Sequence, residues 1–147
     1  ILAYSFPFKF RTILIIVIRI FLNKKIIFVY IFFNFFIIVI LMTISALIVA
    51  RNEEKKIEKC LSSLNFVDEI VVILDRSTDK TLKICKTFSN KIFTGKWTCE
   101  GERRNFGIKK CSSEWIFEID ADEIISKDLA REVKKKIRLH KFDYFYI

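Results

Sequence analysis

The sequence has few of the residues that build metal clusters, disulfide frameworks or phosphate-binding glycine loops. Only His140 could assist the widely spaced cysteines, which form no Cys-x-x-Cys pair, so an ordinary zinc site is disfavoured. Their positions favour reduced thiols in the core of a cytosolic protein. No Gly-x-Gly-x-x-Gly and no Walker lysine occur, which argues against the common dinucleotide and P-loop sites. The four cysteines are Cys60, Cys85, Cys99 and Cys111.

Acidic residues are absent from the first 41 positions, which carry five bases. The remainder holds the other 21 bases against all 17 acids, so it contributes only +4 of the formal +9 charge. So modest an excess does not predict a nucleic-acid partner. At 147 residues the chain is one domain or part of one.

The segment 1–41 is strongly apolar and basic. Residues 26–41 are apolar apart from Asn34, and as a helix would span about 24 Å, somewhat short of a bilayer crossing. Residues 12–22 are interrupted by an arginine, which suits an interfacial or core segment better than a span. Lys24 and Lys25 would lie on the cytoplasmic side under the positive-inside rule. One hypothesis is therefore a membrane anchor.

A second hypothesis for 1–41 follows from its start. The chain begins with Ile1, and Met42 is its only methionine. An acid-free stretch of such biased composition would also arise from reading an untranslated AT-rich region in frame. Both alternatives leave 42–147 as the folded domain, and the intact mass of the natural protein would decide between them.

From Met42 onward, apolar strand-like runs alternate with helical patterns. The order βαβαβαβα predicts an α/β fold with a mostly parallel open sheet and flanking helices. Asn52, then Ser77 or Thr78, and finally Ser126 are expected to cap helices. The expected strands are 44–50, 69–74, 91–94 and 115–119, and 102–111 is an expected helix.

Polar clusters follow three of these strands, at 51–54, 75–79 and 120–123. Ligands of open parallel sheets bind beyond the carboxyl ends of the strands, where the clusters would meet. Converging acids repel unless a cation lies between them, and hard oxygen ligands suit Mg²⁺ or Mn²⁺ with a phosphorylated ligand. Taken alone, Asp120 and Asp122 could simply end a strand and begin a turn. Their shared edge with the other clusters favours a metal and diphosphate site.

Four segments together resemble a known family: ISALIVA with RNEE, EIVVIL with DRSTDKT, GERRNFGIKKC, and WIFEIDADE. From Ile44 to about Ile147 the chain is similar to the nucleotide-sugar-binding half of inverting family-2 glycosyltransferases, which have the GT-A fold. The closest resemblance is to the subgroup that contains lipopolysaccharide-core glycosyltransferases. The segments are specific as a set, and none of them is specific alone.

The resemblance implies roles for individual residues. Asp75 would contact the nucleobase and Arg104 would face the nucleotide. Asp120 would approach the ribose and the metal, and Asp122 would ligate the metal, so that the metal set is Asp120 and Asp122. Leu74 departs from the family pattern, which commonly has a polar residue there, and leaves base recognition to Asp75. The implied nucleotide-sugar pocket comprises Ala50, Asn52, Glu54, Asp75, Arg104 and Asp120.

The function that the resemblance implies is sugar transfer with inversion, assisted by Mg²⁺ or Mn²⁺. The donor would be a UDP-linked or ADP-linked sugar and the acceptor a glycan or lipid in cell-envelope polysaccharide synthesis. The expected location is the cytoplasmic face of the inner membrane. The general base is expected beyond residue 147. We therefore expect this chain to bind a nucleotide sugar but not to transfer it.

Two other functions stay open. One is a non-catalytic nucleotide-binding or interaction module tethered to a membrane. The other is a sugar nucleotidyltransferase, which normally has a glycine-rich loop where this chain has Arg51-Asn52-Glu53-Glu54. Calorimetry with UDP and Mn²⁺ distinguishes a nucleotide site from an interaction module.

Overall fold

The computed structural model describes residues 2–5, 43–138 and 144–146. The apolar stretches 12–22 and 26–41, together with Met42, lie outside these residues, so both hypotheses for the N-terminal segment stay predictions. Within the described ranges, no helix combines the length and apolar character needed to cross a membrane.

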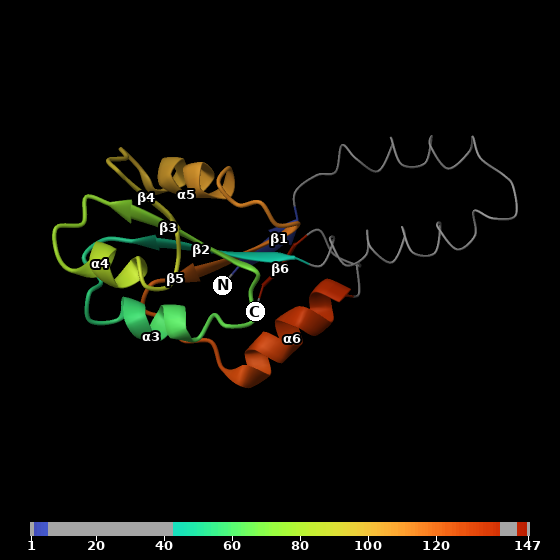
Figure 1. Ribbon diagram of the computed structural model, residues 1–147. Coiled ribbons are helices and arrows are strands. Elements are labelled where there is room, and N and C mark those ends of the chain that lie inside the picture. Colours follow the sequence, from blue (N-terminus) through green and yellow to red (C-terminus); the bar gives the residue numbers. More distant parts are fainter. Residues whose placement is uncertain (1, 6–42, 139–143, 147) are drawn as a thin grey trace, which may run out of the picture.

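A six-stranded sheet forms the centre of the molecule, in the order β4-β3-β2-β5-β1-β6 (Figure 1). Its four parallel strands confirm the predicted α/β fold and begin within a residue of their predicted starts. Strand pairs β2–β3, β2–β5 and β3–β4 are all parallel. The strands are β2 (Ile44–Ala50), β3 (Glu69–Asp75), β4 (Lys91–Gly95) and β5 (Trp115–Asp120).

Two short antiparallel strands extend the sheet beyond β5. β1 (Leu2–Ser5) pairs with β5, and β6 (Tyr144–Tyr146) pairs with the other side of β1. The pairing of β1 was not predicted, because a four-residue apolar run carries no signal for a partner more than 100 residues away.

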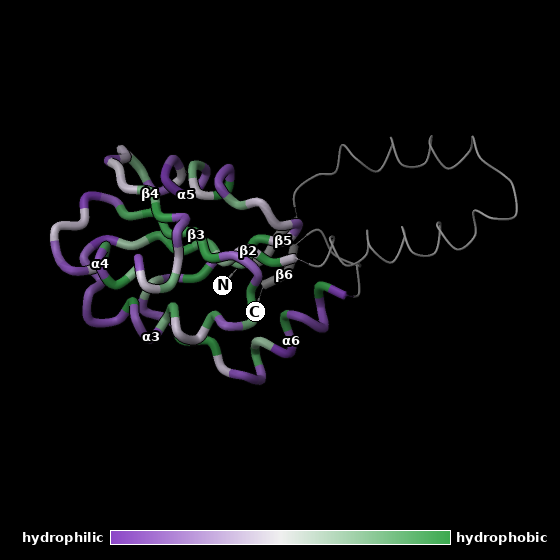
Figure 2. Tube along the Cα trace, viewed as in Figure 1, coloured by the Kyte–Doolittle hydropathy of each residue, from purple (hydrophilic) through white to green (hydrophobic). Residues whose placement is uncertain are grey.

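The helices cover both faces of the sheet (Figure 1). Side chains alternate across a strand, so in β3 Val72 and Leu74 join the larger core, whereas Val71 and Ile73 join the smaller one. Residues of α3, α4 and α6 complete the larger core, and Phe106 and Ile108 of α5 pack on the smaller one. Hydrophobic residues accordingly concentrate in the central strands in Figure 2. The helices are α3 (Ile57–Ser62), α4 (Thr81–Cys85), α5 (Glu100–Ile108) and α6 (Lys127–Arg138).

Several local predictions for the helices are confirmed. Ser126 caps α6, since its Oγ accepts a hydrogen bond of 3.1 Å from the Leu129 amide. Lys136 and Glu132 of the same helix form an i, i+4 ion pair at 3.6 Å. Burial raises the pKa of Cys60 to about 12 and that of Cys85 to about 11, so both are protonated core thiols.

Helix α5 approaches the sheet closely at Gly107. A Cβ atom there would lie 2.5 Å from Leu47 Cδ1 and 2.9 Å from Ile73 Cγ1. These distances are too short for real carbon contacts, so only glycine allows α5 to pack at this height above β2 and β3. The height matters because α5 carries Arg103 and Arg104 to the edge of the sheet.

We predict that Gly107→Ala lowers the free energy of unfolding by about 1–3 kcal/mol, because the methyl group overpacks the interface. The matched control is Gly101→Ala in the same helix, where a Cβ would meet nothing within 4 Å. That change should be neutral or stabilising by up to about 1 kcal/mol, since alanine is the better helix former. Urea unfolding of the two variants checks the difference; equal effects would contradict the close approach.

Candidate functional site

The carboxyl ends of the four parallel strands meet at one edge of the sheet, at the left in Figure 1. The strand register aligns Val49 with Asp120 and Asp75 with Gly95. Ala50, which pairs with Leu74, is buried at the end of β2. The ends of β2, β3 and β5 are therefore level, as the sequence pattern predicted, and the loops that follow them border a common surface, which we call the carboxyl edge.

Asn52 ties the loop after β2 to the loop after β3. Its side-chain Oδ1 accepts a hydrogen bond of 2.8 Å from the Thr78 backbone amide, and the Asn52 backbone amide donates to Ser77 Oγ at 3.1 Å. The backbone of Asn52 has φ 56°, a left-handed conformation that asparagine tolerates better than most residues. The prediction that Asn52 caps the next helix was wrong: α3 begins at Ile57, and the amide side chain binds the neighbouring loop instead.

Glu54 and Asp79 strengthen the same connection. Glu54 Oε2 accepts from the Lys80 amide at 2.9 Å, while Asp79 Oδ2 accepts from the Glu54 amide at 3.1 Å. Asp79 Oδ1 also accepts from the Thr81 amide at 3.0 Å, at the start of α4. The prediction that Ser77 or Thr78 caps this helix was therefore wrong. The backbone amides at its start instead donate to the carboxylates of Glu54 and Asp79, one from each loop. The result is a rigid pair of loops on one side of the carboxyl edge.

Asp75 lies at the end of β3 with its carboxylate held by two arginines. Arg76 donates from Nε at 2.9 Å and from Nη2 at 3.0 Å, and Arg103 Nη1 lies 3.4 Å away. Hydrogen bonding by Arg76 holds the pKa of Asp75 below its usual range. Asp75 is only 3% exposed, so a nucleobase could reach it only if a guanidinium moved aside. Arg76 Nη2 also donates a hydrogen bond of 3.1 Å to the Trp97 carbonyl.

Arg104 crosses from α5 to the end of β5. Glu118 and Asp120 lie on the same face of β5 because they are two residues apart, and Arg104 contacts both of them. The Asp120 contact is 3.5 Å, and Glu100 receives a further bond of 2.8 Å. Glu118 is buried, whereas the Asp120 side chain is 63% exposed. Arg104 is thus anchored on buried Glu118 and held beside Asp120, whose exposed carboxylate a ligand could still reach.

Asp122 lies just beyond β5 and forms an ion pair of 3.1 Å with Lys56, at the N-terminal end of α3. This pairing keeps the pKa of Asp122 below its usual range. Both side chains are more than half exposed, so the pair contributes little stability and is easily opened.

The charge balance of this part of the edge favours a cation. Five carboxylates, joined by hydrogen bonds or by sequence, lie around only two bases, while the neighbouring base of α5, Arg103, is directed to Asp75. Among the described residues no group of three or more potential ligands could hold a metal by itself. Two exposed carboxylates completed by phosphate oxygens suit Mg²⁺ or Mn²⁺, which usually takes only one or two from the protein. The carboxylates are Glu100, Glu118, Asp120, Asp122 and Glu123, and the bases are Lys56 and Arg104.

Lys56 occupies a contact on Asp122 that a divalent cation would take over. We predict that Lys56→Met tightens Mn²⁺ binding in the presence of UDP by about 2–5-fold, because an exposed pair is weak, and the variant removes both the lysine that competes for Asp122 and a local positive charge. Lys59→Met is the control, since Lys59 is an exposed base on α3. Mn²⁺ titration followed by electron paramagnetic resonance measures the change; unchanged or weaker metal binding would contradict it.

Three residues of the edge were not identified from the sequence. Glu118 carried a usable signal, because a charged residue inside the apolar run WIFEID has to find a buried partner. Nothing in the sequence indicated the roles of Lys56 and Arg76. Lys56 is one of several lysines in its segment, and the left-handed backbone of Arg76, φ 52°, could not be predicted from the residue type.

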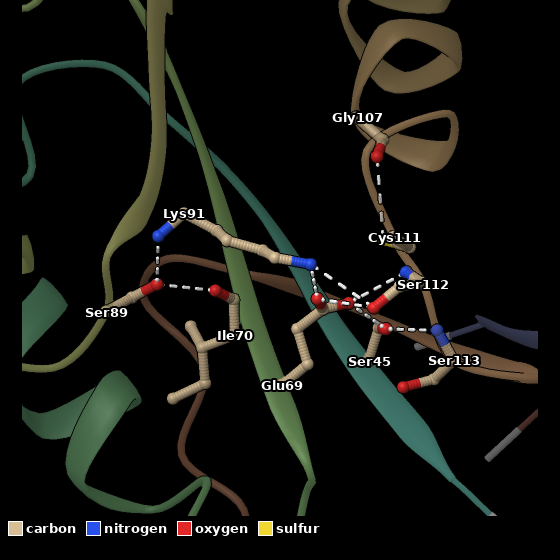
Figure 3. A network of polar contacts seen from close by, with 9 residues as sticks. All are labelled: Ser45, Glu69, Ile70, Ser89, Lys91, Gly107, Cys111, Ser112 and Ser113. Atoms are coloured by element: carbon tan, nitrogen blue, oxygen red, sulfur yellow. Dashed lines mark hydrogen bonds and ion pairs between the residues drawn. The ribbon is translucent and has the colours of Figure 1, made fainter. Parts of the chain in front are cut away.

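Two cavities lie at opposite ends of the sheet. One of about 250 Å³ lies at the carboxyl edge, next to Arg76 and Ser77. A larger one, of about 960 Å³, lies at the amino ends of the strands, where Lys91, Glu69 and Ser112 line it. Figure 3 shows that Glu69 is already bound by Lys91, Ser45 and Ser112. Cavity volume alone would therefore favour a ligand site at the amino ends of the strands, but the exposed carboxylates favour the carboxyl edge as the functional site.

The parallel sheet and its carboxyl edge define an open α/β protein of the GT-A type. Residues 45–146 match the family described as Glycosyl transferase family 2, and the chain belongs to this family.

Two curated relatives illustrate the similarity. An uncharacterized glycosyltransferase of Rickettsia typhi is 33% identical over 103 residues, which cover 69% of this chain and 35% of the relative. The lipopolysaccharide core biosynthesis glycosyltransferase LpsC of Rhizobium meliloti is 32% identical over 93 residues, 60% of this chain and 34% of LpsC. The chain thus spans about a third of the length of these relatives.

Solved structures agree with the fold. Residues 1–349 of S. aureus TarS in complex with UDP superpose with a TM-score of 0.55 at 27% identity, covering 67% of this chain and 32% of that fragment. Glucosyl-3-phosphoglycerate synthase of Mycobacterium tuberculosis, in complex with Mg²⁺ and UDP, has a TM-score of 0.50 at 26% identity, covering 56% of this chain and 34% of the synthase.

Proposed function

We propose that this chain binds a nucleoside-diphosphate sugar at the carboxyl edge, and that the protein transfers the sugar to a glycan or lipid-linked acceptor with inversion. The observation that carries the proposal is the position of Asp120 and Asp122: both are exposed, one at the end of a central parallel strand and the other just beyond it, in a region with surplus negative charge. Membership of glycosyl transferase family 2 and the similarity to two UDP-bound structures support a nucleotide sugar as the ligand.

Each residue of the site would have a separate role in binding the nucleotide sugar. Asp120 and Asp122 would hold Mg²⁺ or Mn²⁺, which when bound stabilises the charge that develops on the leaving diphosphate. Arg104 would orient toward the nucleotide while Glu118 keeps it in place. Asn52 would keep the two loops of the base pocket together.

The base pocket has its own requirement. Arg76 and Arg103 occupy the Asp75 carboxylate, so recognition of the base through Asp75 would follow movement of Arg76, whose side chain is the more exposed of the two. UDP is the first ligand to test because both nucleotide-bound relatives carry it, and ADP is the second.

The wider biological role is also part of the proposal. LpsC is named for lipopolysaccharide core biosynthesis, which supports an acceptor in the cell envelope. A location at the cytoplasmic face of the inner membrane would bring the site to such an acceptor.

Isothermal titration of the chain with UDP, with Mn²⁺ or with EDTA, tests the ligand. We expect measurable binding with Mn²⁺ and at least tenfold weaker binding in EDTA, since the diphosphate then faces the uncompensated carboxylates. Equal affinity in both buffers would contradict the metal's role. A chain that binds neither UDP nor ADP would instead be an interaction module.

A further inference from the structure

Helix α6 presents a line of positive charge along its exposed side. Lys127, Arg131, Lys134 and Arg138 follow the spacing i, i+4, i+7, i+11, which places them on one face of a helix over about 16 Å. All four are exposed, whereas Val133 and Ile137 on another face are buried in the core. We call these four residues the basic stripe.

Little in the described structure neutralises the basic stripe. Arg131 pairs with Asp128, but both side chains are about four-fifths exposed, and such a pair is weak. The other acid of α6, Glu132, is paired with Lys136 beside the stripe. The helix holds six bases and two acids, a net charge of +4, and Figure 2 shows it as largely hydrophilic. A surface of this kind attracts a polyanion.

One exposed apolar residue precedes the basic stripe in the sequence. Ile124, three residues before Lys127, is 62% exposed and is the exposed large hydrophobic residue in the described part of the chain. An exposed aliphatic side chain beside lysines and arginines fits the interface of an anionic bilayer, where the bases contact headgroups and the aliphatic group enters the acyl boundary. Nucleic acid offers the bases an equivalent charge but leaves Ile124 in water.

From these observations we infer that the basic stripe and Ile124 form a docking surface for an anionic lipid membrane. The basic stripe is separate from the carboxyl edge, because α6 begins at Lys127, beyond the acids that follow β5, whereas Ile124 lies between the two. It does not depend on nucleotide binding or on the apolar segment before residue 42, and it would act with that segment if both contact the same bilayer.

The test uses the full chain and two kinds of vesicle. One is phosphatidylcholine alone, and the other contains about a third of phosphatidylglycerol. Sedimentation gives a partition coefficient for each, and their ratio isolates the electrostatic part, because apolar insertion contributes to both. The variant is Lys127→Gln/Lys134→Gln, which keeps helix propensity. The matched control is Lys83→Gln/Lys86→Gln, which removes two exposed lysines in and just after α4.

We expect the basic-stripe variant to lower the ratio by about 30-fold, since each base near an anionic surface contributes about a factor of five. The control should change it by no more than about twofold, and Ile124→Ser should weaken partitioning into the anionic vesicles. UDP affinity should stay the same in the basic-stripe variant and in its control, which separates this surface from the proposed function. Equal ratios for variant and control would overturn the inference. So would stripe-dependent binding of a short RNA without any preference for anionic vesicles.

Discussion

Replacing Asp122 by alanine should weaken UDP binding in Mn²⁺ by about 100-fold. The carboxylate is exposed beyond β5 and ionised, and its present partner, Lys56, gives way easily. Loss of a group that merely supports a metal ligand costs about 10–100-fold, and direct loss of a ligand costs at least as much. The measurement is calorimetric titration of the variant with UDP at saturating Mn²⁺.

Asp128→Ala provides the matched control for that experiment. Asp128 is also an exposed aspartate with a basic partner, but it lies on α6. Its replacement should leave UDP affinity within about twofold, because surface charges at such a distance are screened. In EDTA, the Asp122→Ala variant should bind UDP no more weakly than the unmodified chain, because it lacks one of the carboxylates that repel the diphosphate. A loss of the same size in EDTA would mean that Asp122 acts through the fold or contacts the nucleotide directly.

Glu69→Gln should lower the free energy of unfolding by about 3 kcal/mol at neutral pH. Glu69 binds Lys91, the Ser45 and Ser112 hydroxyls and, at 2.9 Å, the Ser112 amide (Figure 3). It thereby joins β2, β3 and β4 to the segment after α5. Burial alone would raise the pKa of Glu69, but these hydrogen bonds outweigh it and bring the pKa to about 2 from an ordinary 4.5. Each unit of that shift corresponds to about 1.4 kcal/mol.

The pH dependence follows from the direction of this shift. A carboxyl group whose folded pKa is depressed contributes stability that is fully present above the unfolded pKa. For Glu69 that contribution is complete above pH 4.5 and is lost as the pH falls toward about 2. The difference in urea stability between the chain and Glu69→Gln should therefore be largest near neutrality and shrink toward pH 2.

Glu132→Gln is the control for Glu69. Glu132 is 54% exposed and also pairs with a lysine, at 3.6 Å. An exposed i, i+4 pair contributes about 0.3–0.5 kcal/mol, so this variant should be almost as stable as the unmodified chain. Similar losses for both glutamates would show that the Glu69 network adds no more than an ordinary surface pair.

The strands could be predicted from the sequence because their physical cause is local. Each is a short run of branched apolar residues bounded by polar ones, as in ISALIVA, and burial on both faces of a parallel sheet requires that pattern. Once four such runs alternate with helices, their carboxyl ends have to meet. The shared edge of Ala50, Asp75 and Asp120 followed from that argument.

The helix starts near the site could not be predicted in the same way. Asn52 was expected to cap its own helix, but its side chain instead accepts from Thr78, 26 residues later. The cap of α4 likewise depends on Glu54, which belongs to another loop. At these two helix starts, hydrogen bonds between residues far apart in the sequence outweigh the local capping preferences.

The charge pairing of the site was also hidden in the sequence. From the sequence, Asp75 was expected to accept hydrogen bonds from a nucleobase, whereas in the structure its carboxylate is paired with Arg76 and Arg103. The buried arginine contact depends on how closely α5 approaches the sheet, which Gly107 sets. Ion pairs of this kind depend on how helices and strands pack against each other, and this packing cannot be predicted from the periodicity of a single element.

The central claim is that the nucleotide binds at the carboxyl edge and not in the larger cavity at the amino ends of the strands. Amide chemical shifts of the ¹⁵N-labelled chain, recorded during titration with UDP and Mg²⁺, test this most directly. We predict that the shifts concentrate in residues 51–54, 76–79 and 121–123. Shifts concentrated instead in residues 67–69, 89–91 and 112–113, which border the larger cavity, would contradict the account.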